Sequence, residues 1–547
     1  MPAVGVVLGL LVAVAGLALA SRRVGVPYPV VLVLGGLAIA VVPGLPEVTV
    51  APDTVFLVFL PPLVYSAGWL TSLRDFKANL RPIGLLSIGL VLATTVGVAA
   101  LAHAVVPGLP WAAAFALGAI VSPTDTVAAA AIFQRVGAPQ RVQSVLEGES
   151  LVNDATGLIA FRFAVAAVGT GAFSVWEAGA QFVVSSVGGV ALGLALAWLL
   201  IQVQRRIDDP PIEITLSFLV PYGIYLAADG LHLSGVLAVA AAGIYASRRS
   251  SDTFSPASRF QAIAVWEVVT FVLNGLVFIL IGLQLPAIRA GLGGRSPGQL
   301  VLLGVLVSLA VVATRVVWVF PATYLPRLLS AHVRRGDPYP GWRNVAVVAW
   351  TGMRGLVSLA AALSLPLTVG GGRPFPDRDL IIYLTFCVIL ATLVLQGLSL
   401  PLLMRRLGVG DDPSIREAEE LAARSHAIDT ALAQLDAIAA EERVWDEAIR
   451  YLRARYGKRR HTLDARFGRL DHEHRAGDGL RHQHETGADH ALDHRDRLAA
   501  LVRLQRELLA VERAAVVRLR NVGQIGDEVL QRIQRDLDLE ELSLGAE

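Results

Sequence analysis

The stretch EGESLVNDATG, residues 147–157, opens an apolar run that continues to Val168 and is long enough to span a membrane as a helix. Carboxylates in such a helix cost about 3 kcal/mol each on insertion scales, so an acid within a span points to function. Ser150, Asn153 and Asp154 lie three and four residues apart and therefore share one helix face. This face offers a hydroxyl, an amide and a carboxylate, which suit a monovalent cation or a proton. A polar face that only packs on neighbouring helices is the alternative, but that role needs no charge.

The composition indicates a membrane protein with a polar tail. The chain has 547 residues, of which 54% are hydrophobic and only 17% charged, and its mean hydropathy is +0.58. Apolar runs with so few charges predict transmembrane helices. The apolar runs end at about residue 408, and eight of the eleven histidines follow that point. We therefore expect a transmembrane domain at 1–408 and a cytoplasmic helical regulatory tail at 409–547, with no disulfide because Cys387 is alone.

The first domain is predicted to be an all-α polytopic membrane domain of about thirteen spans. The first run has no basic region before it and is expected to be a spanning helix rather than a signal peptide. Eighteen Lys and Arg residues fall in loops that follow odd-numbered spans, and four in the other loops. By the positive-inside rule, the N-terminus is expected outside and the tail in the cytoplasm. The spans are drawn at 3–20, 28–42, 53–69, 82–106, 110–133, 147–168, 179–203, 213–228, 233–247, 260–285, 299–325, 344–366 and 380–404.

Two of these spans are interrupted in the middle. The fifth contains SPTDT at 122–126, and the twelfth contains TGMRG at 351–355. Irregular backbone at membrane depth persists only where it is packed in protein or lines a cavity. The two breaks are seven spans apart, as in inverted repeats, and paired broken segments point to a transport site near the midplane. An ordinary kink at Pro123 is the alternative, which Asp125 beside it makes less attractive.

Few charged residues fall within the predicted spans. An uncompensated buried charge is very costly, so we expect these residues to pair. Glu149 is predicted to pair with Arg315 or Arg354. Asp125 and Asp154 then remain for the transported ion.

Five motifs carry a resemblance to a known family. They are SPTDTVAAAAIF at 122–133, GESLVNDATGLI at 148–159, LPPLVYSAGW at 60–69, FVLNGLVFILIGLQLP at 271–286 and GMRGLVSLAAALSLP at 352–366. In this order they resemble the monovalent cation/proton antiporters, in the electroneutral branch of NhaP-like and NHE-like Na+/H+ exchangers. The resemblance covers the whole membrane domain. It implies the NhaA-like antiporter fold with inverted repeats and broken helices 5 and 12.

The resemblance also implies roles for the residues at the first break and in the sixth span. Asp154 would carry the cation or the proton. Thr124, Asp125 and Ser150 match positions close to or ligating the Na+ ion. Asn153 would steady the site, and with Asp154 it matches the Asn-Asp pair of the electroneutral branch.

Further positions match the structural part of the family's site. Glu149 matches a buried acid that pairs with an arginine, and both Arg315 and Arg354 fall on arginine positions of the family. The third span departs from many relatives, since Ser66 stands where they carry an acid. Ser66 can line the site but offers only a hydroxyl, which leaves the number of ligands and the preference for Na+ or K+ open. The resemblance further implies a homodimer whose six-helix core moves against a scaffold.

The expected function is therefore antiport of Na+ against H+ across the plasma membrane, with K+ and Li+ as alternative cations. Competition of cation and proton at Asp154 with alternating access would make the exchange electroneutral and serve pH and sodium homeostasis. We expect no enzyme activity, no cofactor besides the transported Na+ and H+, no nucleic-acid partner, and membrane lipid as surroundings. A K+/H+ antiporter, a cation channel on a similar bundle, and an intramembrane hydrolase using Ser150 or the two aspartates are the other readings.

The tail is predicted to form helices that pair within a dimer or on the membrane domain. Apolar residues recur at helical spacing after residue 414, at about 495–522, and from Gly526 to about Leu542. A His-rich linker at 470–494 lies between the first two stretches. It is expected to be a solvated linker, with a pH sensor or a loose metal site as alternatives.

Overall fold

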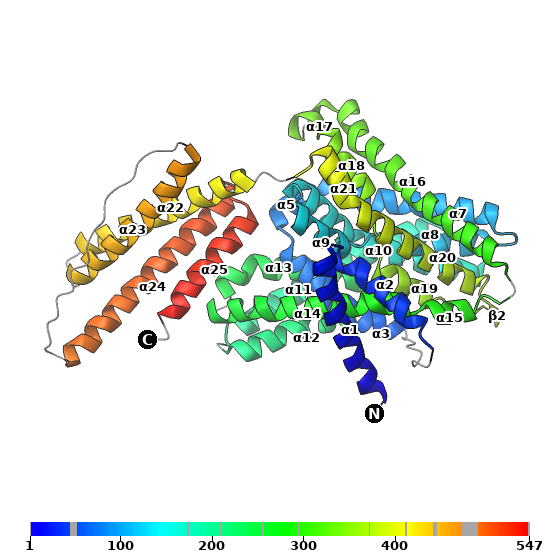
Figure 1. Ribbon diagram of the computed structural model, residues 1–547, viewed down its shortest axis with the longest axis horizontal. Helices are drawn as coiled ribbons and strands as arrows, with labels where there is room; N and C mark the ends of the chain where they lie inside the picture. The colour runs from blue at the N-terminus through cyan, green and yellow to red at the C-terminus, as the bar shows by residue number, and fades with distance from the viewer. Residues whose placement is uncertain are drawn as a thin grey trace. The chain divides into compact units, whose positions relative to one another are not determined.

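The computed structural model describes residues 2–43, 52–171, 174–207, 209–253, 256–293, 295–337, 339–370, 372–410, 413–440, 446–471 and 491–544. In these residues the all-helical prediction is confirmed, apart from one two-stranded hairpin (Figure 1). The chain divides into two compact units, each described here by itself. The first comprises Met1–Phe254 and Gln261–Asp411, and the second comprises Ser255–Phe260 and Asp412–Glu547.

The first unit holds twenty-one α-helices, two π-helical turns and the hairpin among its described residues. In chain order they are α1 Pro2–Val24, α2 Tyr28–Ala40, α3 Pro52–Val58, α4 Leu60–Leu70, α5 Leu73–Ala78, α6 Leu80–Gly84, η1 Leu85–Leu90, α7 Val91–Val105, α8 Trp111–Val121, α9 Val127–Val136, α10 Gln140–Thr170, α11 Val175–Gln204, α12 Pro210–Gly230, α13 Gly235–Thr253, α14 Pro256–Leu283, α15 Leu285–Ala290, α16 Pro297–Leu329, α17 Ala331–Gly336, α18 Trp342–Trp350, α19 Leu356–Leu363, β1 Thr368–Val369, β2 Arg373–Pro374, α20 Arg378–Ala391, η2 Thr392–Gln396 and α21 Gly397–Leu407.

Each predicted apolar segment overlaps at least one of these helices. Among the described residues, eight helical stretches are long and apolar enough to cross a membrane, and α2 and α8 are among the shorter apolar ones. Chain length and composition therefore establish a polytopic membrane unit, while the number thirteen stays a prediction. The fifth predicted span is two helices, α8 and α9, and the twelfth is α18 and α19.

Two groups of buried apolar side chains fill the first unit. The large cluster draws on α1–α3, on η1 through α10, on α14–α16 and on α18–α21. The small cluster draws on α4, α11, α12 and α13. Helix α10 contributes to both, since Val142 and Phe161 belong to the large cluster whereas Leu151 and Ala155 belong to the small one. The polar stretch at 147–157 therefore lies on the helix that joins the two clusters.

Small residues let the helices of this unit approach closely, as is common where lipid removes the hydrophobic driving force. A Cβ atom on Gly193 of α11 would lie 2.0 Å from the carbonyl oxygen of Ala238 in α13. A Cβ atom on Gly118 of α8 would lie 2.3 Å from the carbonyl oxygen of Thr95 in α7. Any larger residue at either position would push two helices apart.

Ion pairs show which interhelical loops meet. Asp337, after α17, pairs with Arg81 at 2.6 Å, Arg141 at 2.5 Å and Arg327 at 2.6 Å. With the spans drawn above, all three arginines fall in loops that follow odd-numbered spans. Three such loops therefore meet at one carboxylate. Asp377 pairs with Arg295 at 2.5 Å, which joins two of the remaining loops.

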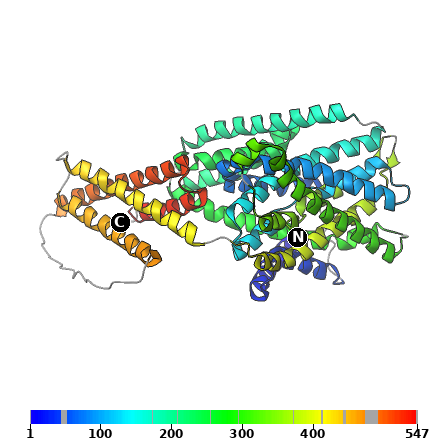
Figure 2. The ribbon, with the colours of Figure 1, turned by 90° about the horizontal axis from the view of Figure 1, so that it is seen from above.

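The second unit is a helical bundle of α22 Pro413–Ala440, α23 Asp446–Asp471, α24 Ala491–Val522 and α25 Asp527–Ser543. Figure 2 shows α22 and α25 along the long α24. Apolar side chains from α22 and α24 form two small buried clusters, one with α23 and one with α25. Of the predicted His-rich linker, 472–490 lies outside the described residues, as does the side chain of His494.

Candidate cation site

The site is built on one side of α10. Glu149 and Asn153 are 1% exposed, and they lie one helical turn apart on the side of α10 that faces the first break. Leu151 and Ala155 lie on the side that contributes to the small cluster. Because a helix advances by 3.6 residues per turn, Asp154 falls between these two sides.

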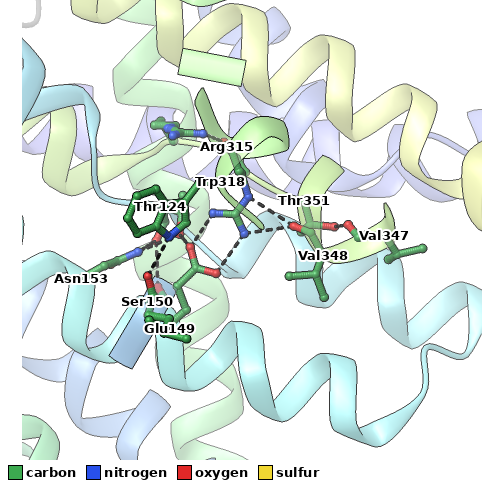
Figure 3. A network of polar contacts seen from close by, with 12 residues as sticks. Thr124, Glu149, Ser150, Asn153, Arg315, Trp318, Val347, Val348 and Thr351 are labelled. Atoms are coloured by element: carbon green, nitrogen blue, oxygen red, sulfur yellow. Dashed lines mark hydrogen bonds and ion pairs between the residues drawn. The ribbon is translucent and has the colours of Figure 1, made fainter. Parts of the chain in front are cut away.

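Glu149 is fully paired. Its Oε1 accepts a hydrogen bond of 2.5 Å from Nη1 of Arg315, and its Oε2 accepts one of 2.9 Å from Nη2 (Figure 3). Arg315 lies on α16, is 0% exposed, and also donates to the carbonyl of Val348 in α18 through Nε and Nη2. A bidentate pair of this kind is strong and geometrically specific. Of the two arginines considered for Glu149, the structure therefore pairs it with Arg315.

Thr124 connects the paired acid to the neighbouring polar residues. Its hydroxyl donates to Oε1 of Glu149 at 2.9 Å and accepts from Nδ2 of Asn153 at 2.7 Å. Its carbonyl accepts from the hydroxyl of Ser150 at 2.9 Å. Figure 3 shows these three side chains of α10 converging on Thr124. The hydroxyls of Thr124 and Ser150 thus hold the first break against α10, while Oδ1 of Asn153 is buried without a partner in the described residues.

The two breaks contact each other. The backbone N–H of Asp125 donates to the carbonyl of Met353 at 2.8 Å. Nε of Arg354 donates to the carbonyl of Val121 at 3.1 Å, so its guanidinium caps the negative C-terminal end of α8. The backbone N–H of Arg354 donates to the hydroxyl of Thr392 in η2 at 3.1 Å. Arg354 therefore bonds to groups at the contact between the two breaks, and no described hydrogen bond joins it to Glu149.

Asp125 has a structural task as well as a place in the site. Its Oδ1 accepts from the backbone N–H of Val127 at 2.8 Å and so caps the start of α9. A Cβ atom on Gly355 would lie 1.9 Å from Oδ2 of Asp125, so only glycine fits beside this carboxylate. The sequence singled out Asp125 for its charge; the capping bond and the glycine next to it were not foreseen.

Asp154 differs from both of these acids. Its carboxylate makes no hydrogen bond or ion pair with the part of the chain that the structure describes, and the side chain is half-buried. It interacts electrostatically with Asp125, so the two predicted ion-binding carboxylates are near each other. Ser66 makes no described hydrogen bond to these residues. Its hydroxyl donates to the carbonyl of Leu63 in its own helix at 2.9 Å.

The partners that sequence reasoning missed are mostly backbone groups. The carbonyls of Val121, Val348 and Met353 accept from the residues of the site. Every residue carries a carbonyl, so no pattern of side chains could have singled these out. Thr392 was missed for a different reason: a hydroxyl in an apolar span ordinarily bonds its own helix, and Thr392 does so while also accepting from Arg354.

Two broken helices whose breaks contact each other, with an acid that has no described partner beside them, are typical of ion-coupled secondary transporters. A family model described as "Sodium/hydrogen exchanger, transmembrane" matches residues 9–406. An uncharacterized Na+/H+ exchanger of Mycobacterium tuberculosis (strain ATCC 25618 / H37Rv) is 37% identical over 554 residues, which cover 99% of this chain and 97% of the relative. The chain belongs to the sodium/hydrogen exchanger family.

Two further similarities bear on the ion and the fold. A sodium, potassium, lithium and rubidium/H+ antiporter of Bacillus pumilus (strain SAFR-032) is 37% identical over 415 residues, covering 73% of this chain and 61% of the relative. The structure of the sodium proton antiporter MjNhaP1 from Methanocaldococcus jannaschii superposes with a TM-score of 0.58 at 19% identity, covering 75% of this chain and all of the other. The predicted antiporter fold is therefore confirmed.

Proposed function

We propose that the protein exchanges Na+ for H+ across the plasma membrane, one for one, with Asp154 as the group that both ions use. The observation that carries this proposal is the contrast on α10. Glu149 is neutralised by Arg315, whereas Asp154, five residues further on, has no partner in the described residues. An ionisable group that is expensive to place in a membrane and is left unpaired is kept for a ligand.

The position of Asp154 supports alternating access. It lies on α10 between the side that faces the first break and the side that contributes to the small cluster. An ion held at such a boundary could be exposed to one side of the membrane or the other if the helices of the two clusters shift against each other. Thr124, Asp125 and Ser150 supply further oxygens close by, although their described hydrogen bonds show that Thr124 and Ser150 also hold the break in place.

Competition at one carboxylate then couples the two ions. The carrier reorients with Asp154 neutralised by Na+ or by a proton, and reorientation with a bare carboxylate is suppressed because moving an unpaired charge through the low-dielectric interior is costly. The net charge moved per cycle is zero. Homodimer formation and a role in pH and sodium homeostasis are part of the same proposal and rest on the resemblance to the family.

Purified full-length protein in sealed liposomes with an internal pH dye tests the proposal. An outward Na+ gradient should drive proton uptake against a proton gradient, and clamping the membrane potential at zero with K+ and valinomycin should leave the initial rate unchanged. Leak of Na+ without opposed proton movement would show a channel instead. A rate that changes with the clamped potential would contradict one-for-one exchange.

The same assay addresses the alternative cation. The Bacillus pumilus relative is named as an antiporter of several monovalent cations, and Ser66 offers a hydroxyl at the third-span position where many relatives have an acid. Proton uptake is therefore measured with Na+, Li+, K+ and Rb+ in turn, using a different method of voltage clamping for K+ and Rb+. Saturation with K+ at lower concentration than with Na+ would make the protein a K+/H+ antiporter.

A further inference from the structure

The helical bundle of the second unit holds a cavity of about 380 Å³. This volume falls within the range of small-molecule sites, which often lie between the helices of bundles. Side chains from α22, α23, α24 and α25 line it. Every lining residue belongs to the second unit, so the cavity is a feature of the tail alone.

The charge that faces this cavity is mainly positive. Its lining includes four cationic side chains from two helices and a single carboxylate among the described residues. These side chains are Arg424 of α22, Arg455, Lys458 and Arg459 of α23, and Glu512 of α24. Further acids pair with the arginines from positions that do not line the cavity. These acids are Glu420, Asp536 and Glu540.

The cations on α23 keep donors for a ligand. Nη2 of Arg455 donates to Glu540 at 2.7 Å. Arg459 donates to Glu512 through Nη1 and Nη2 at 3.2 and 3.3 Å, which is longer than the roughly 2.7–2.9 Å of strong charge-assisted bonds. Lys458 is exposed, and its ammonium makes no ion pair with the part of the chain that the structure describes. Since a guanidinium has five N–H donors and an ammonium three, several donors of this group remain for an anion.

The spacing on α23 concentrates these cations on one helix face. Arg455, Lys458 and Arg459 lie three and four residues apart, and like charges at this spacing destabilise a helix. Arg460, which does not line the cavity, pairs instead with Asp464 one turn further on, at 3.3 Å. The helix therefore accepts repulsion on the face toward the cavity while it pairs charges on a neighbouring face.

The remaining lining is mostly apolar and comes from three helices. Empty space beside apolar side chains forfeits their dispersion contacts, so a bundle built only for stability would fill it. A cavity with this lining is better explained by a ligand that covers it. The residues are Ala427 and Ile428 of α22, Thr462 and Leu463 of α23, and Ile533 and Leu537 of α25.

The two kinds of lining define the chemistry of the ligand. Guanidinium groups bind phosphate through paired N–H donors, and a lysine ammonium adds a compact charge. A free phosphate ion is much smaller than the cavity and would leave the apolar lining uncovered. An anion that carries an apolar body would meet both parts.

We propose that this cavity binds a small organic phosphate, whose phosphate group lies against Arg455, Lys458 and Arg459 and whose apolar body covers Ile533 and Leu537. Every residue in this proposal belongs to the second unit, so the site does not depend on the proposed exchange activity.

Isothermal titration calorimetry of the purified full-length protein in a nonionic detergent tests the site with three probes. Naphthyl phosphate carries both parts of the proposed ligand, naphthol only the apolar body, and inorganic phosphate only the anion. Naphthyl phosphate should bind once per chain and at least about 10-fold more tightly than either part, after subtraction of the heat in protein-free detergent buffer. Inorganic phosphate binding as tightly as naphthyl phosphate would overturn the organic class of the ligand. The absence of saturable naphthyl phosphate binding would overturn the site.

Two matched variants of α23 locate the binding. Lys458→Gln removes an exposed cation that lines the cavity and has no described ion pair, so the bundle should stay folded. Its affinity for naphthyl phosphate should fall by about 10-fold, as expected for the loss of one charge-assisted contact. Arg450→Gln removes an exposed cation of the same helix that does not line the cavity, and it should bind as the wild type does. Equal affinities in the two variants would overturn this placement of the phosphate.

Discussion

Two carboxylates on α10, five residues apart, have opposite surroundings. Glu149 is 1% exposed and held by both terminal nitrogens of Arg315, with Thr124 as a third donor. Asp154 is half-buried and has no described partner. The same helix therefore carries one acid that serves the fold and one without a described partner, which we propose is kept for the transported ion. The difference teaches that an acid within a membrane is not by itself a transport residue; its protein partners decide between the two roles.

The strongest test of this comparison is to neutralise Asp154. Asp154→Asn keeps the shape of the side chain and removes the carboxylate that we assign to Na+ and H+. Exchange should fall to the level of empty liposomes, measured by the internal pH dye. Thermal unfolding in detergent should begin no lower than in the wild type, since no buried partner loses its counter-charge. Substantial exchange by a folded Asp154→Asn protein would remove Asp154 from the mechanism.

The same chemical change at the paired acid should act on the fold instead. Glu149→Gln leaves the guanidinium of Arg315 uncompensated at 0% exposure, which should lower the free energy of unfolding by about 3–5 kcal/mol. Arg315→Met should be similarly damaging, and the double variant Glu149→Gln/Arg315→Met should recover part of the loss because no lone charge remains. Unfolding monitored by tryptophan fluorescence measures all three. A Glu149→Gln protein as stable as Asp154→Asn would show that the two acids do not differ in this way.

The sequence was sufficient to predict that Glu149 is paired, which the structure confirms, whereas the role of Asp154 stays a prediction. The cost of a charge in lipid predicts that Glu149 is paired. The predicted spans hold three arginines, Arg162, Arg315 and Arg354, of which the last two were the candidates. The sequence could not choose between Arg315 and Arg354, because both lie far along the chain and the choice depends on how α16 and the second break are packed. In the structure Arg354 donates to the carbonyl of Val121 at the end of α8, and no sequence pattern marks a backbone carbonyl as a partner.

The same limit explains what was missed in the tail. Arg259 of α14 and Asp538 of α25 form a buried ion pair. Arg259 stands just before an apolar run, where a basic residue ordinarily indicates only the orientation of a span. Asp538 lies in an amphipathic helix rich in charges, where most acids are solvated. Nothing in either local pattern indicates that these two residues are buried against each other, because their pairing depends on contacts between segments 279 residues apart. The helices themselves were predictable from apolar spacing, whereas their partners were not.

A smaller effect should follow from crowding the third acid of the site, Asp125. In Gly355→Ala the added Cβ atom would meet Oδ2 of Asp125, so this carboxylate or the second break must move. Exchange should fall by about 10-fold or more, since small displacements of functional groups are costly to their chemistry. Gly223→Ala on α12 is the matched control, because nothing lies within 4 Å of the added atom there. Equal rates in the two variants would show that the close approach to Gly355 does not position Asp125.

The smallest effect on stability is expected at Asp337, an acid near the surface. Asp337 binds Arg81, Arg141 and Arg327, but the side chains of the acid and of two of these arginines remain partly exposed. Asp337→Asn should therefore lower the free energy of unfolding by at most about 1 kcal/mol, far less than Glu149→Gln. Exchange should stay at the wild-type rate, because none of the described contacts of Asp337 reaches the residues assigned to the ion.

The pH dependence of this difference follows from the same contacts. Partial burial alone would raise the pKa of Asp337, but hydrogen bonds and attraction from Arg141 and Arg327 outweigh it and hold the pKa below its ordinary value of 3.8. Because the folded pKa is the lower one, the stabilisation is fully present at neutral pH and is lost as the pH falls through the folded pKa. Wild type and Asp337→Asn should therefore differ in unfolding midpoint by a constant amount from pH 8 down to about pH 5, and converge only in stronger acid. A difference that vanished near neutral pH would mean that a group other than Asp337 titrates. High salt should shrink the difference at every pH, since Asp337 and two of its arginines are partly exposed.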